Sequence, residues 1–122
     1  MEKYLHMLGK PARKSLIEYA LSKYSAAELA GILGLSKAAI SKYVSGETHP
    51  SDRVLEKLIQ TADEELRAKL LERIAGELVD ALIELMREYR EAAGPVKSET
   101  LLRDVCDVLC SLSWEGSNPG TG

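Results

Sequence analysis

A long run without proline, residues 63–93, most constrains what this chain can fold into. Its apolar residues recur at the three- and four-residue spacing of an α-helix, and Gly94-Pro95 ends the run. At ~1.5 Å per residue such a helix is ~45 Å long, which exceeds the width of a globule of about 100 residues. The chain therefore cannot be one compact ball in which this helix merely crosses the core.

Apolar side chains cover more than half of the circumference of this predicted helix. They are Leu71, Ile74, Ala75, Leu78, Val79, Leu82, Ile83, Leu85, Met86 and Tyr89. Acidic side chains, Glu77, Asp80, Glu84, Glu88 and Glu91, occupy the remainder. A stripe that faces a single core needs only ~100° of the surface, so this helix has apolar surface for two partners.

A further helix is predicted over 98–113, with an apolar stripe of its own. If it folds back on the long helix, it covers part of the apolar surface and leaves a strip for another subunit. We therefore predict a homodimer. The expected interface residues are Leu78, Leu82, Leu85, Met86, Tyr89, Leu101, Val105 and Leu109. The alternative is a bundle that closes within one chain.

Helical periodicity also runs through the N-terminal half, and no segment alternates as a strand does. Serine caps and glycine stops divide this half into helices near 11–24, 26–33, 36–45 and 51–62. The predicted fold class is all-α. The expected organisation is a domain over 1–71, a helical dimerisation extension over 72–116 and a flexible tail over 117–122.

The formal net charge of −3 conceals an uneven distribution. Residues 1–60 hold nine basic and six acidic side chains, whereas residues 61–122 hold seven and thirteen. The total argues against a histone-like, generally basic nucleic-acid binder. It leaves room for a local basic face in the N-terminal half.

Composition favours an ordinary intracellular protein. No apolar stretch reaches the ~18 residues of a membrane span, and the first residues lack a secretory pattern. Cys106 and Cys110, four residues apart in a predicted helix, are poorly spaced for a disulfide, which favours a reducing, cytoplasmic location. A single asparagine and a single glutamine are typical of thermophilic proteins.

No constellation of residues indicates catalysis. His6 and His49 do not form a zinc spacing with the two cysteines. A glycine-rich phosphate loop, a nucleophile–base pair and a metal triad are all missing from the sequence. We expect no enzymatic activity, no metal and no cofactor.

The most informative segment is 25–51, SAAELAGILGLSKAAISKYVSGETHPS. Leu29 and Leu33 give its first short helix an apolar face, and Ile40 gives one to the second. Gly34 stands at the turn between them, where glycine most easily adopts a left-handed conformation. Two short helices joined by such a turn form a helix-turn-helix unit.

This segment resembles the lambda-repressor-like (XRE) helix-turn-helix family of transcriptional regulators. The matching residues are Glu28-Leu29-Ala30, Gly34-Leu35-Ser36, Ile40-Ser41-Lys42-Tyr43, Ser45-Gly46 and Pro50-Ser51. The resemblance covers about residues 12–71. It implies a five-helix DNA-binding domain, whose fifth helix is here the long one, bound to double-stranded DNA.

In such a domain the second helix of the unit enters the major groove, and its first residues meet base edges. The resemblance places Lys37, Ala38, Ser41 and Lys42 at the bases. It places Ser36, Tyr43, Thr48, His49 and Arg53 at the phosphates, and Lys42 is a candidate there as well as at the bases. For Tyr43, packing in the core is an equal alternative.

Two departures from the family pattern weaken base recognition. Ala26 stands where many members have a glutamine that braces the backbone contact, and the recognition helix has no Arg, Asn or Gln. Bidentate contacts to bases are therefore few, so specificity is modest or depends on DNA shape.

We predict a transcriptional regulator that binds a pseudo-palindromic DNA site as a homodimer, with no effector indicated by the sequence. One alternative is an antitoxin- or adaptor-type module whose acidic half captures another protein. The other is an accessory DNA-binding piece of a recombination system.

Overall fold

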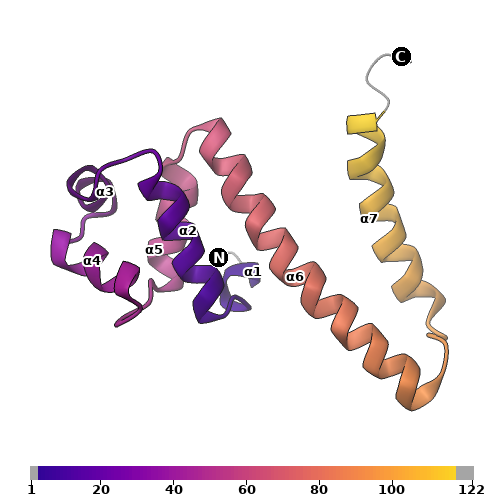
Figure 1. The fold of residues 1–122 in the computed structure, drawn as a ribbon. Coiled ribbons are helices and arrows are strands. Elements are labelled where there is room, and N and C mark those ends of the chain that lie inside the picture. The colour runs from indigo at the N-terminus through magenta and orange to yellow at the C-terminus, as the bar shows by residue number, and fades with distance from the viewer. Residues whose placement is uncertain (1–2, 118–122) are drawn as a thin grey trace. The chain divides into compact units, whose positions relative to one another are not determined.

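The computed structural model describes residues 3–117, with side chains through residue 111. Helices are the only regular elements in that part of the chain, which confirms the predicted all-α class (Figure 1). They are α1 (Lys3–His6), α2 (Lys10–Leu21), α3 (Ala26–Leu33), α4 (Lys37–Ser45), α5 (Asp52–Thr61), α6 (Glu64–Ala93) and α7 (Glu99–Ser117). The short α1 escapes prediction because four residues carry no periodicity. The expected tail after Ser117 lies outside the described residues.

The chain divides into two compact units, a head over residues 1–82 and a C-terminal unit over residues 83–122. The head continues beyond residue 71, where the sequence suggests that a domain ends. Ile74 on α6 is only 3% exposed, and Leu78 packs against the same core. The first half of α6 is therefore part of the head.

One hydrophobic core holds the head together, and every head helix contributes to it. Its members are Leu5, Leu8, Ala12, Leu16, Ile17, Ala20, Leu29, Ala30, Leu33, Ile40, Tyr43, Leu55, Leu58, Ile59, Ala62, Leu66, Leu70 and Ile74. No charged side chain is buried among the described residues. Apolar burial is thus the main force that positions α4.

The helix ends follow the sequence signals. The hydroxyls of Ser25, Ser36 and Ser51 each accept a hydrogen bond from the backbone three residues on, which caps α3, α4 and α5. Gly34 and Gly46 end α3 and α4 with φ of 67° and 81°, in the left-handed region that favours glycine.

A set of hydrogen bonds from Arg13, called here the Arg13 clasp, holds the segment before α5 in place. The guanidinium donates to the carbonyl oxygens of Leu5 (2.8 Å), Leu8 (3.0 Å) and Pro50 (3.1 Å) and to Oδ1 of Asp52 (2.6 Å). Its side chain is only 14% exposed. One residue of α2 thereby links the N-terminal turn to the α4–α5 loop.

The C-terminal unit contains the end of α6, from Ile83, and α7. Large apolar side chains remain exposed on both helices. They are Ile83 (43%), Leu85 (55%), Tyr89 (39%), Leu101 (42%), Leu102 (45%), Val108 (59%) and Leu109 (54%). Over residues 83–111 of one copy, each helix therefore covers the apolar face of the other only in part.

Candidate nucleic-acid interface

Helices α3 and α4 pack against each other across the turn at Gly34. Leu29 and Leu33 of α3 and Ile40 of α4 are at most 5% exposed, and together they fix the crossing of the two helices. Helix α4 also packs against α2. The position of α4 is therefore set by buried contacts, and its opposite side is free for a ligand.

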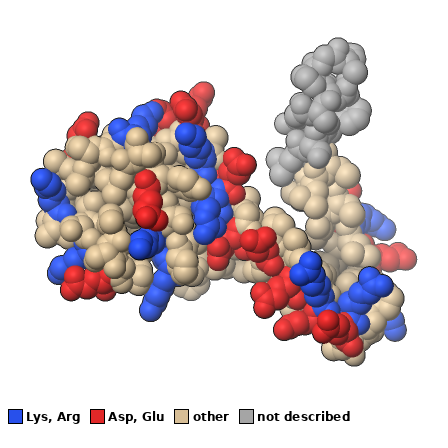
Figure 2. Space-filling model, in the orientation of Figure 1, with Lys and Arg blue, Asp and Glu red and all other residues tan. Residues whose placement is uncertain are grey.

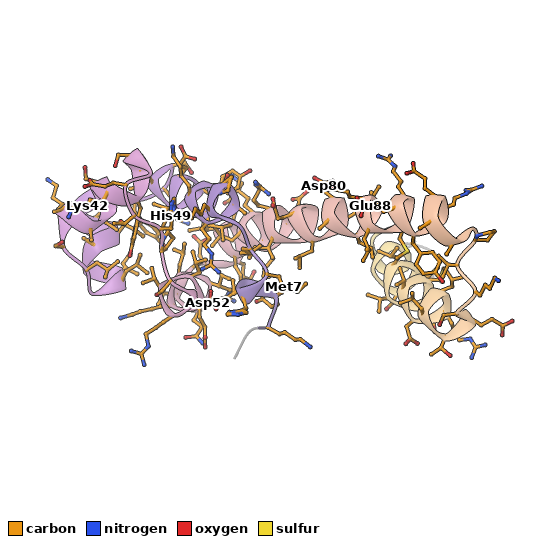
Figure 3. All side chains as sticks on the ribbon, turned by 90° about the horizontal axis from the view of Figure 1, so that it is seen from below. Met7, Lys42, His49, Asp52, Asp80 and Glu88 are labelled. Carbon is orange, nitrogen blue, oxygen red and sulfur yellow. The ribbon has the colours of Figure 1, made fainter. Side chains whose placement is uncertain are left out.

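The four predicted base contacts share that outer side. Lys37, Ala38, Ser41 and Lys42 are all exposed, and Lys42 projects away from the head (Figure 3). Lys37 and Ser41 are one turn apart, so their side chains are neighbours on the helix surface. The structure thus brings the candidates together on one face at the start of α4.

The predicted phosphate contacts surround this face unevenly. Ser36, Thr48 and Arg53 are exposed, although the Ser36 hydroxyl also accepts a hydrogen bond from the Ala39 N–H at 3.1 Å. His49 is half-buried, with a buried Nδ1 that has no protein partner (Figure 3). His49 is therefore less accessible to a phosphate than Ser36, Thr48 and Arg53.

Tyr43 belongs to the core cluster and is 8% exposed. Burial raises the pKa of its hydroxyl above the ordinary value, because the ionised form loses hydration. Packing therefore describes Tyr43 better than the phosphate contact suggested by the family resemblance. Helical spacing alone could not separate the two roles.

The start of α3 carries a fixed negative charge. Glu28 accepts a hydrogen bond from the Ser25 backbone N–H at 3.1 Å, while the Ser25 hydroxyl accepts one from the Glu28 N–H. The bond from the Ser25 backbone, and then the one involving its hydroxyl, lower the pKa of Glu28. Glu28 lies two residues after Ala26, where the family resemblance implies a backbone contact, so its negative charge makes a phosphate less favoured here.

Basic residues do not gather in one place on the face of the head that Figure 2 shows. On the face drawn in Figure 2, Lys and Arg alternate with Asp and Glu and form no single basic patch. One cation that the sequence did not single out is Lys57 on α5, whose Nζ lies 3.5 Å from the place a Cβ on Gly34 would occupy. Its position at the turn becomes apparent only when α5 is folded against α3.

The candidates for the dimer interface separate into three groups. Leu78 is half-buried against the head core, so it has little surface left for a partner. Met86 and Val105 are half-buried in the C-terminal unit. The remaining candidates are 37% exposed or more: Leu82, Leu85, Tyr89, Leu101 and Leu109.

Other kinds of site find little support in residues 3–117. No three His, Cys, Asp or Glu side chains of that range are placed to hold a metal ion, and none of its helices is long and apolar enough to cross a membrane. Cys106 and Cys110 are exposed free thiols.

The buried crossing, the left-handed turn and the capped, outward-facing second helix define a helix-turn-helix domain, a class that binds DNA. The comparison with family models agrees with this class: residues 16–68 match the model of a helix-turn-helix family of the XRE, or lambda-repressor-like, type. Residues 69–122 lie beyond the match. No curated protein and no solved structure matches the chain.

Proposed function

We propose that this chain is a transcriptional regulator that binds double-stranded DNA in the major groove through α4. The observation that carries the proposal is the outer face of α4. Its buried residues Ile40 and Tyr43 hold the helix on the head, while Lys37 and Ser41 are exposed one turn apart. A rigid helix with a polar, partly cationic face is what the groove admits.

Lys37, Ala38, Ser41 and Lys42, which are exposed on α4, each have a chemical role in this proposal. Lys37 donates to O6 and N7 of guanine, Ser41 hydrogen-bonds a base edge, and Ala38 contacts a thymine methyl group. Lys42 and Arg53 contact phosphates, which position the helix without selecting a sequence. Because α4 has no Arg, Asn or Gln for bidentate base contacts, the shape of the DNA supplies part of the specificity.

The proposed active form is a homodimer on a pseudo-palindromic site. Two heads place two copies of α4 in successive major grooves, one DNA turn or ~34 Å apart. The dimer doubles the phosphate contacts, so it raises affinity as well as specificity.

Selection of genomic fragments by the purified full chain tests this function most directly. We expect an enriched sequence with two related half-sites, and the absence of any enriched sequence would contradict specific regulation. If ~6–10 phosphates are neutralised, affinity falls by several orders of magnitude between 50 mM and 200 mM salt. Binding that is indifferent to salt would contradict major-groove binding.

Lys37→Ala provides the residue-level test. We expect the variant to bind the selected site about 10-fold more weakly, with much less effect on unrelated DNA, since a lost base contact costs ~1–3 kcal/mol. Lys69→Ala is the matched control, because Lys69 is also an exposed lysine but lies on α6. Equal losses of Lys37→Ala on both DNAs would make Lys37 a phosphate contact instead.

The exposed apolar side chains of the C-terminal unit favour a second candidate, an antitoxin- or adaptor-type module. In that case the purified chain is a monomer that binds a different protein through this unit. An accessory role in recombination predicts the same DNA binding but only alongside a catalytic protein, and a strand-transfer assay with and without the chain separates it from regulation.

A further inference from the structure

The apolar faces of the C-terminal unit are wider than one neighbouring helix requires. At about 100° per residue, Ile83, Leu85, Met86 and Tyr89 span about 160° of α6. Around α7, the apolar residues follow one another in the order Val108, Leu101, Val105, Leu109, Leu102 and Cys106. This arc is also about 160° wide. A helix that packs against a single neighbour needs only ~100°. Each helix of the unit is therefore patterned for two neighbours.

The exposed apolar area matches what a stable homodimer buries. Seven large apolar side chains of the unit are 39–59% exposed. At about 80 Å² each, they present on the order of 600 Å² of apolar surface. A standard interface buries about 800 Å² per partner, of which about 65% is apolar in homodimers. The surface available is thus sufficient without any contribution from the head.

The contact between the two helices also leaves an apolar hollow. A depression of 460 Å³ is lined by Met86, Arg90, Pro95, Val96 and Leu102, at the corner where α6 ends and α7 begins. It is open to solvent in a single copy. A large apolar side chain from another helix would fit such a space.

The charges of the unit permit association with an identical copy. Glu88 and Glu91 alternate with Arg87 and Arg90 on α6, and acidic and basic atoms are interleaved there in Figure 2. Glu88, labelled in Figure 3, is exposed to solvent. Charges of both signs border the apolar face of α6, so like-charge repulsion between two copies of this helix is small.

We propose that two copies of the chain pair their α6–α7 hairpins into one four-helix bundle. Two copies of a two-helix hairpin supply four helices, and a closed four-helix bundle gives each of them two neighbours. The proposal specifies the partner and the architecture of the homodimer on which the proposed function depends. It differs from a two-stranded coiled coil of α6 alone, because α7 contributes half of the interface.

Sedimentation equilibrium of the full chain without DNA tests the bundle. We expect a wild-type dimer at micromolar concentration, and at least about 100-fold weaker association of Leu109→Glu, since this change places a charge in the apolar centre. Ser111→Glu is the matched control: it adds the same charge to α7 on the polar side, and it should leave the dimer intact. Leu85→Glu should weaken the dimer as strongly as Leu109→Glu, because both helices contribute. Circular dichroism of each variant checks that the helices persist.

Three results would overturn the bundle. A wild-type monomer at 100 µM would leave the apolar face to a different protein. A dimer unaffected by Leu109→Glu but lost in Leu85→Glu would indicate pairing through α6 alone. Equal weakening by Leu109→Glu and Ser111→Glu would indicate a general effect of charge. The head is tested separately: Lys37→Ala should still dimerise, and monomeric Leu109→Glu should still bind a half-site.

Discussion

The two parts of α6 carry the same types of apolar residue, but these residues are buried in the first part and exposed in the second. In the head, Leu66, Leu70 and Ile74 are at most 3% exposed, whereas Leu85 in the C-terminal unit is 55% exposed. Both stretches have the spacing that forms a helix. They differ in what surrounds them, since α2 to α5 supply a core for the first stretch only. Periodicity in a sequence predicts the helix, and tertiary partners decide which apolar face is buried.

The largest expected difference in stability is between the variants Leu70→Ala and Leu85→Ala. Leu70 is fully buried, so its truncation leaves a cavity, and we expect the free energy of unfolding to fall by about 2–5 kcal/mol at every protein concentration. Thermal unfolding followed over a range of concentrations measures both variants. Leu85→Ala should change the Tm only where the wild-type protein associates. An equal, concentration-independent loss in both variants would erase the distinction between the two parts of α6.

Arg13 tests whether the head depends on polar contacts as well as on its core. Arg13→Ala removes four hydrogen bonds from a charged donor, and we expect it to lower the free energy of unfolding by about 2–4 kcal/mol. Urea unfolding of the full chain gives the value for both variants. An exposed arginine of the C-terminal unit, Arg103, is the control, and Arg103→Ala should change stability by less than about 0.5 kcal/mol.

Two glycines are expected to respond in opposite directions. A Cβ on Gly76, within α6, meets no atom within 4 Å, so Gly76→Ala should stabilise the protein by about 0.5–1 kcal/mol through helix propensity. Gly34 has φ of +67°, so Gly34→Ala should destabilise the head by about 1 kcal/mol or more. Calorimetry on both variants measures the difference. Stabilisation by Gly34→Ala would contradict the left-handed turn.

The stability of the head should decrease at low pH, in part because Asp52 becomes protonated. Hydrogen bonds from His6 and Arg13 lower the pKa of this carboxyl in the folded protein below its ordinary value of 3.8. A lowered pKa contributes stability above the unfolded value and loses it as the pH falls through the folded one. Urea unfolding between pH 5 and pH 2 should therefore show a shallower decline for Asp52→Asn than for the wild type. Identical pH profiles would show that Asp52 is not coupled to folding.

The sequence predicts most of the head because its signals are local. Ser25, Ser36 and Gly34 specify helix ends through backbone geometry alone, and they are found where expected. The Arg13 clasp could not be predicted in this way, since Arg13 and Asp52 are 39 residues apart and neither belongs to a motif. Tyr43 illustrates the same limit, because a residue on a short amphipathic helix can point to the core or to a ligand.

The Arg13 clasp has a consequence for how this head can vary over evolution. A planar guanidinium supplies five donors in a fixed fork, whereas a lysine ammonium supplies three from one atom and cannot span the same acceptors. Residue 13 and the Pro50–Asp52 segment are therefore tied to each other. We expect related sequences to change the two together, so that loss of the arginine accompanies a remodelled loop after α4. In the proposed complex, such a change would alter the footprint of the protein on DNA.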